Sequence, residues 1–212
     1  MNERFNEESM VLVVEDDTVL RESLGSLFQS VGLRTQLYES TTELIKSQLP
    51  DKPSCLVLDV RLPGQSGLEF QDYLARQNLH IPIIFITGYG DIPMTVRAMK
   101  HGAIEFLTKP FRDQDLLDAV GAGIERAHAQ RSIDSRVSDL RTRFDRLTPR
   151  EKQVFELVAS GLMNKQIAHE LGVSEITVKV HRGNVTHKMH AKSLAELVRM
   201  ADALKLRKVN SK

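Results

Sequence analysis

The sequence predicts two domains: an α/β domain with a five-stranded, parallel, doubly wound sheet, followed by an all-α domain of four helices. In the first 125 residues, short β-branched apolar runs alternate with helical patterns, which is typical of a parallel sheet covered on both faces. From residue 147 on, the patterns are helical only and are separated by glycines and capping residues. The net charge also changes sign between the two parts.

Charge is distributed unevenly along the 212 residues, although the formal net charge of the whole chain is only +1. Residues 1–125 carry 11 basic and 19 acidic side chains, a net of −8, and residues 147–212 carry 12 and 6, a net of +6. A basic domain is a candidate for binding a polyanion such as a nucleic acid. Because opposite charges attract at low salt, we hypothesise that the acidic domain blocks the basic one until a signal releases it.

The composition excludes several classes of protein. With 41% hydrophobic and 27% charged residues the chain is typical of globular proteins, and its one cysteine, Cys55, cannot form an internal disulfide or a cysteine-based zinc site. The acidic and polar residues 1–9 do not look like a signal peptide. Apolar runs all fall short of the roughly 18 residues that a membrane span needs. We therefore expect a cytoplasmic protein without a membrane partner.

Five strands are expected in the first domain, each as a short apolar run with helical patterns between them. Leu20, Leu24 and Phe28 are spaced for one face of the helix after the first strand. Ser66 and Glu69 form a capping box that begins a later helix. The expected strands cover residues 10–14, 33–38, 55–60, 81–87 and 103–109.

Polar side chains stand at the carboxyl ends of four of these strands. Because such ends meet at one edge of a parallel sheet, where ligands bind, these groups should share a pocket. Clustered carboxylates suit Mg²⁺, and a carboxylate can attack phosphorus while an ammonium neutralises the phosphoryl oxygens. The residues are Glu15, Asp16 and Asp17, then Asp59, Thr87 and Lys109.

Residues 10–125 resemble a response-regulator receiver domain, through the segments VVEDD, LVLDVRLPGQSG, FITGYGD and FLTKPF. The resemblance implies that a sensor histidine kinase transfers a phosphoryl group to Asp59. It implies that Mg²⁺, which Mn²⁺ can replace, is held by Asp16, Asp59 and the backbone carbonyl of Arg61. Glu15 would act through water, at a position where Asp is commoner in the family.

The resemblance also gives roles to the groups around the phosphoryl acceptor. Thr87 and Lys109 would hold the phosphoryl oxygens, and Phe106 would move with them as the switch aromatic. The family commonly has Tyr at this last position, so here the ring cannot donate a hydroxyl hydrogen bond. Arg61 and Tyr89, each two positions after a motif residue, would set the lifetime of the phosphoryl group.

Two other functions are weighed against this one. Phosphohydrolases of the haloacid-dehalogenase type also use an Asp nucleophile with Mg²⁺, but they need a second Asp two positions later as general acid. This sequence has Arg61 there. A regulator that binds DNA without phosphorylation is the second alternative, and the intact set of acidic residues argues against it.

Residues 126–146 are predicted to form a helical linker between domains at residues 9–125 and 147–206. Gly121 and Gly123 precede it and interrupt the helical pattern, each costing about 1 kcal/mol against Ala. Apolar residues then recur at spacings of four and three, as in a coiled coil of two heptads. A dimerising helix and an amphipathic linker that lies on one domain both remain open. The recurring residues are Ile133, Val137, Leu140, Phe144 and Leu147.

Capping residues and glycines divide the second domain into four helices. Helix, glycine turn and helix in succession is helix-turn-helix geometry, whose second member enters the major groove of DNA. The boundary residues are Thr148, Pro149, Glu151 and Gly161 for the first helix, Gly172 and Ser174 for the turn, and Ser193 with Glu196 for the fourth helix.

The third of these helices has a core side and a polar side. A rotation of 100° per residue places Val178, Val185 and Met189 toward the core. The opposite side is basic with one small apolar contact, which suits base edges and a thymine methyl, and two cations at its flanks suit phosphates. The predicted DNA contacts are Thr177, Lys179, Val180, Arg182, Gly183, Asn184, His187 and Lys188.

Residues 147–206 are similar to the LuxR-type DNA-binding domain, so the whole chain resembles a two-component response regulator of the FixJ/NarL type. Family members commonly have a polar residue at the position of Gly183, so base contacts are expected to shift to Asn184 or His187. The resemblance implies a phosphorylated homodimer that binds an inverted-repeat operator in double-stranded DNA and acts on RNA polymerase. Its dimer contacts are expected at Arg97 and Lys100 and, on the fourth helix, at Leu197, Val198 and Ala201.

Overall fold

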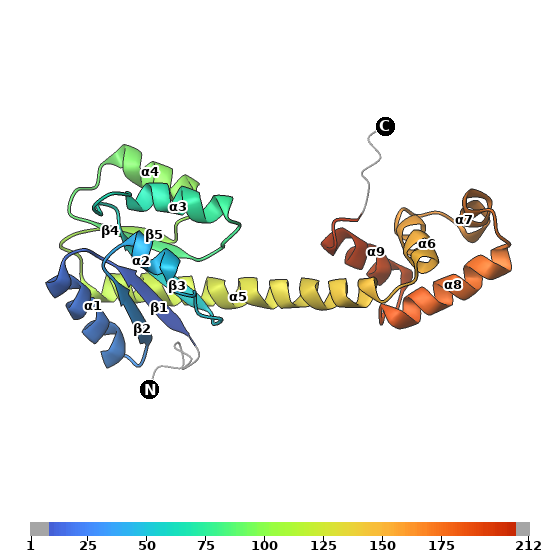
Figure 1. Cartoon of the computed structure of the whole chain (residues 1–212), viewed down its shortest axis with the longest axis horizontal. Coiled ribbons are helices and arrows are strands. Elements are labelled where there is room, and N and C mark those ends of the chain that lie inside the picture. Colours follow the sequence, from blue (N-terminus) through green and yellow to red (C-terminus); the bar gives the residue numbers. More distant parts are fainter. Residues whose placement is uncertain (1–8, 207–212) are drawn as a thin grey trace. The chain divides into compact units, whose positions relative to one another are not determined.

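The computed structural model describes residues 9–206, and the chain divides into two compact units after Arg131 (Figure 1). Residues 1–8, on which the prediction of no signal peptide mainly rests, lie outside the described residues. In the part of the chain that is described, no helix has the length and apolarity to cross a membrane.

The first unit is built on a parallel five-stranded sheet with strand order β2-β1-β3-β4-β5, as the sequence predicts. Val13 of the central β1 is in register with Leu37 of β2 and Val57 of β3. The strands are β1 (Met10–Val14), β2 (Arg34–Tyr38), β3 (Ser54–Asp59), β4 (Ile83–Thr87) and β5 (Glu105–Thr108).

Four strands start or end one or two residues away from their predicted bounds. The largest differences are at β4, which begins at Ile83 rather than at residue 81, and at β5, which covers four residues rather than seven. Pro82 explains the first case, because proline has no N–H to donate to the ladder. Its carbonyl still accepts a hydrogen bond of 2.9 Å from the N–H of Leu56.

Helices cover both faces of the sheet (Figure 1). Side chains alternate along each strand, so Val11 and Val13 face one layer while Leu12 and Val14 face the other. The first layer contains α1 (Thr18–Ser30) and the start of α5 (Asp113–Asp145). The second contains α2 (Thr41–Lys46), α3 (Gly67–Arg76) and α4 (Ile92–Lys100). The predicted capping box of Ser66 and Glu69 begins α3.

Helix α5 is continuous for 33 residues, so Gly121 and Gly123 do not interrupt it. A side-chain carbon at Gly123 would lie 2.4 Å from Sγ of Cys55. The glycine therefore lets α5 pack directly on β3, which offsets its low helix propensity.

The predicted coiled-coil seam is divided between core and surface. Phe144 and Leu147 are 5% and 4% exposed in the core of the second unit, whereas Ile133 is 53% exposed. The Phe144 ring packs edge-on against Phe155, with 5.5 Å between centroids. The end of α5 is therefore an amphipathic segment that packs on the second unit, which is one of the two predicted alternatives.

The second unit contains the four predicted helices, α6 (Pro149–Ala159), α7 (Asn164–Leu171), α8 (Glu175–Lys188) and α9 (Leu194–Ala203). Thr148 and Glu151 form the expected reciprocal cap of α6. Gly172 ends α7 in the left-handed region with φ of 65°, where glycine carries no steric cost. This turn gives α7 and α8 the predicted helix-turn-helix arrangement.

Candidate functional site

One lysine joins two carboxylates at the carboxyl edge of the sheet. Nζ of Lys109, after β5, lies 2.7 Å from Oδ2 of Asp59 at the end of β3 and 2.7 Å from Oε2 of Glu15, after β1. The side chains of Glu15 and Asp59 are only 1% and 7% exposed. The structure thus brings together strand ends that are up to 94 positions apart in sequence.

The three consecutive acidic residues after β1 have different surroundings. Glu15, Asp16 and Asp59 each offer one carboxylate oxygen, and these three atoms lie within 4.8 Å of one another, so the three residues could hold a metal ion. Asp17 instead caps α1, because its Oδ1 accepts hydrogen bonds from the N–H groups of Val19 and Leu20. The donor set at the edge of the sheet is entirely oxygen, which fits Mg²⁺.

Burial and charge shift the protonation equilibria in this pocket. Burial raises the pKa of the Glu15 carboxyl to about 7, and the charge of Asp59 adds to this, while the hydrogen bond from Lys109 opposes it. For Lys109, burial lowers the pKa, but hydrogen bonds to Asp59 and Glu15 outweigh it and raise the pKa above its usual value. The lysine therefore stays an ammonium at neutral pH.

The backbone also contributes to the pocket. Oδ1 of Asp59 accepts a hydrogen bond of 2.9 Å from the N–H of Arg61. The guanidinium of Arg21 donates to the carbonyl of Glu15 at 2.6 Å and to that of Asp16 at 3.2 Å. Arg21 therefore holds the acidic loop in place, a role that the sequence prediction missed. Its position in the first turns of the helix after an acidic run was the available signal.

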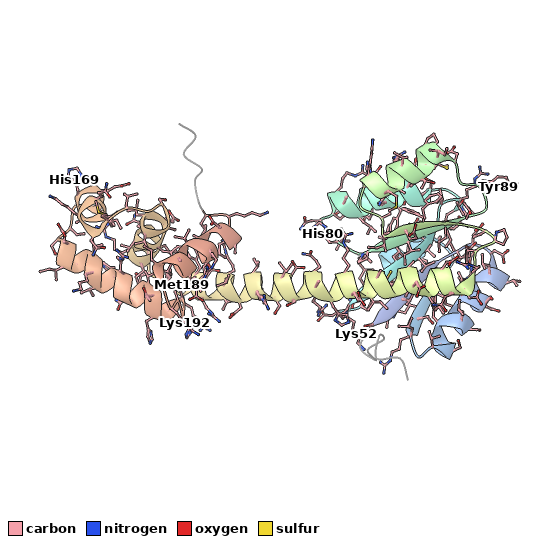
Figure 2. All side chains as sticks on the ribbon, turned by 180° about the vertical axis from the view of Figure 1, so that it is seen from behind. Lys52, His80, Tyr89, His169, Met189 and Lys192 are labelled. Atoms are coloured by element: carbon pink, nitrogen blue, oxygen red, sulfur yellow. The ribbon has the colours of Figure 1, made fainter. Side chains whose placement is uncertain are left out.

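The remaining residues predicted for this site lie around the loop that follows β4. Thr87 is fully buried, and its hydroxyl accepts from the N–H of Tyr89 and donates to the carbonyl of Tyr89, both at 3.3 Å. Tyr89, labelled in Figure 2, is 71% exposed, and the guanidinium of Arg61 lies 4.5 Å from the centre of its ring. Phe106 is half-buried, with its ring 6.1 Å from that of Phe85.

Helix α8 of the second unit has the two sides that the sequence predicts. Val178, Val185 and Met189 are at most 1% exposed. On the other side Val180 is 58% exposed, and Lys179, Gly183, Asn184 and His187 are exposed with it. Ile176, 78% exposed and one turn before Val180, extends the apolar part of this side. The sequence prediction missed this residue, although its position two residues before the buried Val178 places it on the opposite side of the helix.

Three further residues predicted to contact DNA have partners within the second unit. Nζ of Lys188 lies 2.7 Å from Oε2 of the buried Glu151, and Arg182 donates to the side-chain carbonyl of Asn164. The Thr177 hydroxyl lies 2.8 Å from that of Ser174. The first two contacts therefore help to hold α8 against α6 and α7, whereas the third lies within the N-terminal cap of α8 itself.

The contact between Lys188 and Glu151 also affects the pKa of the Glu151 carboxyl. Burial alone would raise the pKa of its carboxyl, but hydrogen bonds from Lys188 and from the backbone and side chain of Thr148 outweigh it and hold the pKa below its usual value. The carboxylate therefore stays ionised inside the domain and fixes the C-terminal part of α8 to the start of α6.

The structure corrects part of the predicted dimer contact. Leu197 and Ala201 of α9 are 3% and 0% exposed and belong to the core of the second unit, so they cannot meet another subunit. Their apolar spacing along α9 reflects packing in the core of the domain. The sequence pattern alone cannot distinguish such packing from a contact between subunits. Val198 is half-buried.

The other predicted dimer residues lie on α4. Arg97 pairs with Asp72 of α3 at 2.7 Å, and Nδ1 of His101 lies 2.7 Å from the other oxygen of Asp72. Lys100 is exposed. An apolar stripe also runs along α4 and is exposed to 80%, 44% and 42% at Ile92, Val96 and Met99.

Comparisons with known proteins agree with these two units. Residues 11–121 match the response regulator receiver domain, and residues 145–201 match the luxR family of bacterial regulatory proteins. Nodulation protein W of Bradyrhizobium diazoefficiens is 60% identical over 92% of this chain and 86% of its own. The transcriptional regulatory protein FixJ of Azorhizobium caulinodans is 44% identical over 90% of each chain.

A solved structure gives the same result. The solved structure of the response regulator StyR is 47% identical in sequence and matches this structure with a TM-score of 0.77. The match covers 92% of this chain and 98% of StyR. Sequence, fold and relatives thus lead to one family. The chain belongs to the two-component response regulators of the FixJ type, which regulate transcription through a receiver domain and a LuxR-type DNA-binding domain.

Proposed function

We propose that phosphoryl transfer from a sensor histidine kinase to Asp59 converts this chain into a dimer with higher affinity for operator DNA. The observation that carries the proposal is the contact of one ammonium, that of Lys109, with both Asp59 and Glu15 at 2.7 Å. We assign the receiver domain to residues 9–125, the linker to 126–146 and the DNA-binding domain to 147–206.

In the chemical step, a carboxylate oxygen of Asp59 attacks the phosphorus of a phosphohistidine. The new P–O bond replaces the P–N bond, the nitrogen keeps the electron pair, and uptake of one proton from water leaves a neutral imidazole. The Lys109 ammonium then faces the phosphoryl oxygens, where a preorganised charge is most effective. Arg61, two positions later, cannot serve as the general acid of a phosphohydrolase, because its guanidinium does not release a proton at neutral pH.

Mg²⁺, or Mn²⁺ in its place, supplies positive charge that stabilises the transferred group when it is bound. The residues that would hold it are Asp16, Asp59 and the backbone carbonyl of Arg61, with Glu15 acting through water. Three carboxylates within 4.8 Å of one another support this set.

Thr87, Phe106 and the pair of Arg61 and Tyr89 would respond to the phosphoryl group. The Thr87 hydroxyl now bonds to the backbone of Tyr89, and it would donate to a phosphoryl oxygen instead. Arg61 and Tyr89, which stack on each other at the surface, would control the access of water to the acyl phosphate and hence its lifetime.

Dimerisation is proposed at α4 and β5, within the receiver domain. The exposed stripe of Ile92, Val96 and Met99 offers apolar area to a second copy, and Lys100 lies on the same helix. Arg97 would have to exchange Asp72 for a partner on the other subunit. Two copies would place two α8 helices on the half-sites of an inverted repeat, from which the dimer acts on RNA polymerase in the cytoplasm.

The test measures the mass by light scattering and the DNA affinity of the full chain with Mg²⁺, before and after acetyl phosphate. We expect a shift from monomer to dimer and tighter DNA binding in the wild type, and neither in Asp59→Asn. Equal affinity for both proteins in the presence of acetyl phosphate would instead favour a regulator that binds DNA without phosphorylation.

A further inference from the structure

Within the loop after β4, Gly90 leaves no room for a side chain beside the switch aromatic. A side-chain carbon built at Gly90 would lie 2.9 Å from Cε1 of Phe106 and 3.0 Å from Cγ2 of Thr108, both on β5. The first of these distances is too short for two carbon atoms and the second is very tight, so the Phe106 ring or the loop would have to shift to admit a side chain. The loop and β5 therefore approach each other at Gly90 with space for a glycine only.

Glycine is required at this position for steric reasons and not for its backbone conformation. The backbone of Gly90 is not in the left-handed region, which other residues rarely adopt, so another residue could adopt its conformation. Gly88, two residues earlier in the same loop, differs: a side-chain carbon there would meet none of the described atoms within 4 Å. Between them, Tyr89 directs its ring to Arg61.

The same loop is tied to the phosphoryl-binding threonine. The Thr87 hydroxyl makes two hydrogen bonds to the backbone of Tyr89, the residue directly before Gly90. If this hydroxyl turns toward a phosphoryl oxygen, its bond to the Tyr89 carbonyl is lost. Gly90, where a side-chain carbon would meet the Phe106 ring, follows one peptide unit after that change.

From these contacts we propose that Gly90 is a positioning residue that transmits the movement of Thr87 to Phe106, and that it can do so because it lacks a side chain. The inference rests on the proposed phosphorylation of Asp59 and adds to it a route from the pocket to β5. Gly90 does not touch the reacting groups, so the chemistry at Asp59 does not depend on it.

Gly90→Ala tests this route, since the added methyl group displaces the Phe106 ring or the loop whether or not Asp59 is phosphorylated. We measure the DNA affinity of the full chain with and without acetyl phosphate, together with the rate of Asp59 phosphorylation. The ratio of the two affinities is expected to fall about fivefold or more, which is within the usual range of coupling between sites. The rate of phosphorylation is expected to stay at the wild-type value.

Two comparisons separate this route from a general disturbance of the loop. Gly88→Ala adds the same methyl group where there is room and should keep the wild-type ratio. In a Phe106→Leu background, the smaller side chain removes the close contact, so Gly90→Ala should have little further effect on that variant's own ratio. This double variant also provides the test if Gly90→Ala alone does not fold.

A wild-type ratio in Gly90→Ala would overturn the inference, as would an equal loss in Gly88→Ala or an undiminished loss in the Phe106→Leu background. A drop in phosphorylation rate that accounts for the whole loss would also overturn it. If the wild type itself gains no DNA affinity from acetyl phosphate, the proposed function fails as well. A responsive wild type with a responsive Gly90→Ala variant overturns this inference alone.

Discussion

The two units of this chain use charged side chains in opposite ways. In the first unit the carboxylates of Glu15 and Asp59 are buried and already paired, with the half-buried Lys109 between them. In the second unit the candidate DNA surface is exposed and includes apolar Ile176 and Val180, while the ion pair of Lys188 with the buried Glu151 lies between helices. A pocket for chemistry must order its charges in advance, whereas a surface for a polyanion leaves them solvated until the partner arrives. An ion pair therefore marks the site in one unit and the scaffold in the other.

Lys109→Met should show the largest effect, because it removes the cation while keeping a side chain of similar length. Without the ammonium, the phosphoryl oxygens would lose the side-chain cation that faces them, and the rate of phosphoryl uptake from acetyl phosphate should fall about 100-fold or more. Intact-protein mass spectrometry over time measures this rate. Lys46→Met, which removes an exposed lysine of α2, is the matched control. Equal rates in both variants would mean that Lys109 has only a structural role.

The first unit was the more predictable of the two, for a topological reason. Once five strands are recognised as parallel, their carboxyl ends must share an edge, so Glu15, Asp59 and Lys109 come together without knowledge of any side-chain contact. Contacts that depend on packing were not predictable. Gly123 against Cys55 and Gly90 against Phe106 are close approaches between segments far apart in sequence, and no pattern of spacing encodes them.

Glycines in the long helices of the two units offer the next test. Gly123→Ala should destabilise the first unit by about 1–3 kcal/mol, because the added carbon lies 2.4 Å from Sγ of Cys55. Gly183→Ala on α8 adds a carbon that meets no described atom within 4 Å, and it should stabilise the second unit by up to about 1 kcal/mol. Hydrogen exchange of the full chain reports on each unit separately.

A third variant identifies the cause of the effect at Gly123. Cys55→Ala removes the sulfur atom that the new methyl group would meet, so the double variant Cys55→Ala with Gly123→Ala should regain part of the lost stability. An unchanged cost in the double variant would place the strain elsewhere along α5. From the packing of the two helices, we expect Gly123→Ala to lower the stability of its unit and Gly183→Ala to raise that of the other.

In the second unit, the helical pattern correctly separated the two sides of α8 but could not identify partners. Positions such as Lys179 and Val180 follow from rotation about the helix axis, and they are exposed as expected. Arg182 and Lys188 lie at the flanks, where a cation can reach either a phosphate or a neighbouring helix, and only the fold distinguishes these two cases. The same ambiguity misplaced Leu197 and Ala201, whose apolar spacing fits a core as well as an interface.

Glu151→Gln should weaken the second unit by about 1–3 kcal/mol, because it replaces a charged partner of Lys188 and of the α6 cap. Since the folded-state pKa of Glu151 lies below its usual value, its contribution is fully present above pH of about 4.5 and is lost as the pH falls through the folded-state pKa. Hydrogen exchange of α6 and α8 between neutral and acidic pH measures this. The wild type should lose more protection in acid than the variant does, and parallel pH profiles would contradict the assignment.

The smallest effects are expected when two lysines of α8 are replaced and the DNA affinity and stability of the two variants are compared. Lys179→Ala removes an exposed cation from the candidate DNA surface, so it should weaken DNA binding and lower the slope of log affinity against log salt by about 1 without changing stability. Lys188→Ala leaves the buried Glu151 without its cationic partner, so it should lower the stability of the second unit more than it lowers DNA affinity. DNA titrations at several salt concentrations, paired with hydrogen exchange, give both quantities for both variants. The reverse pattern would show that Lys188 leaves Glu151 for a phosphate in the complex, and the distinction between scaffold and surface charges would then not hold on α8.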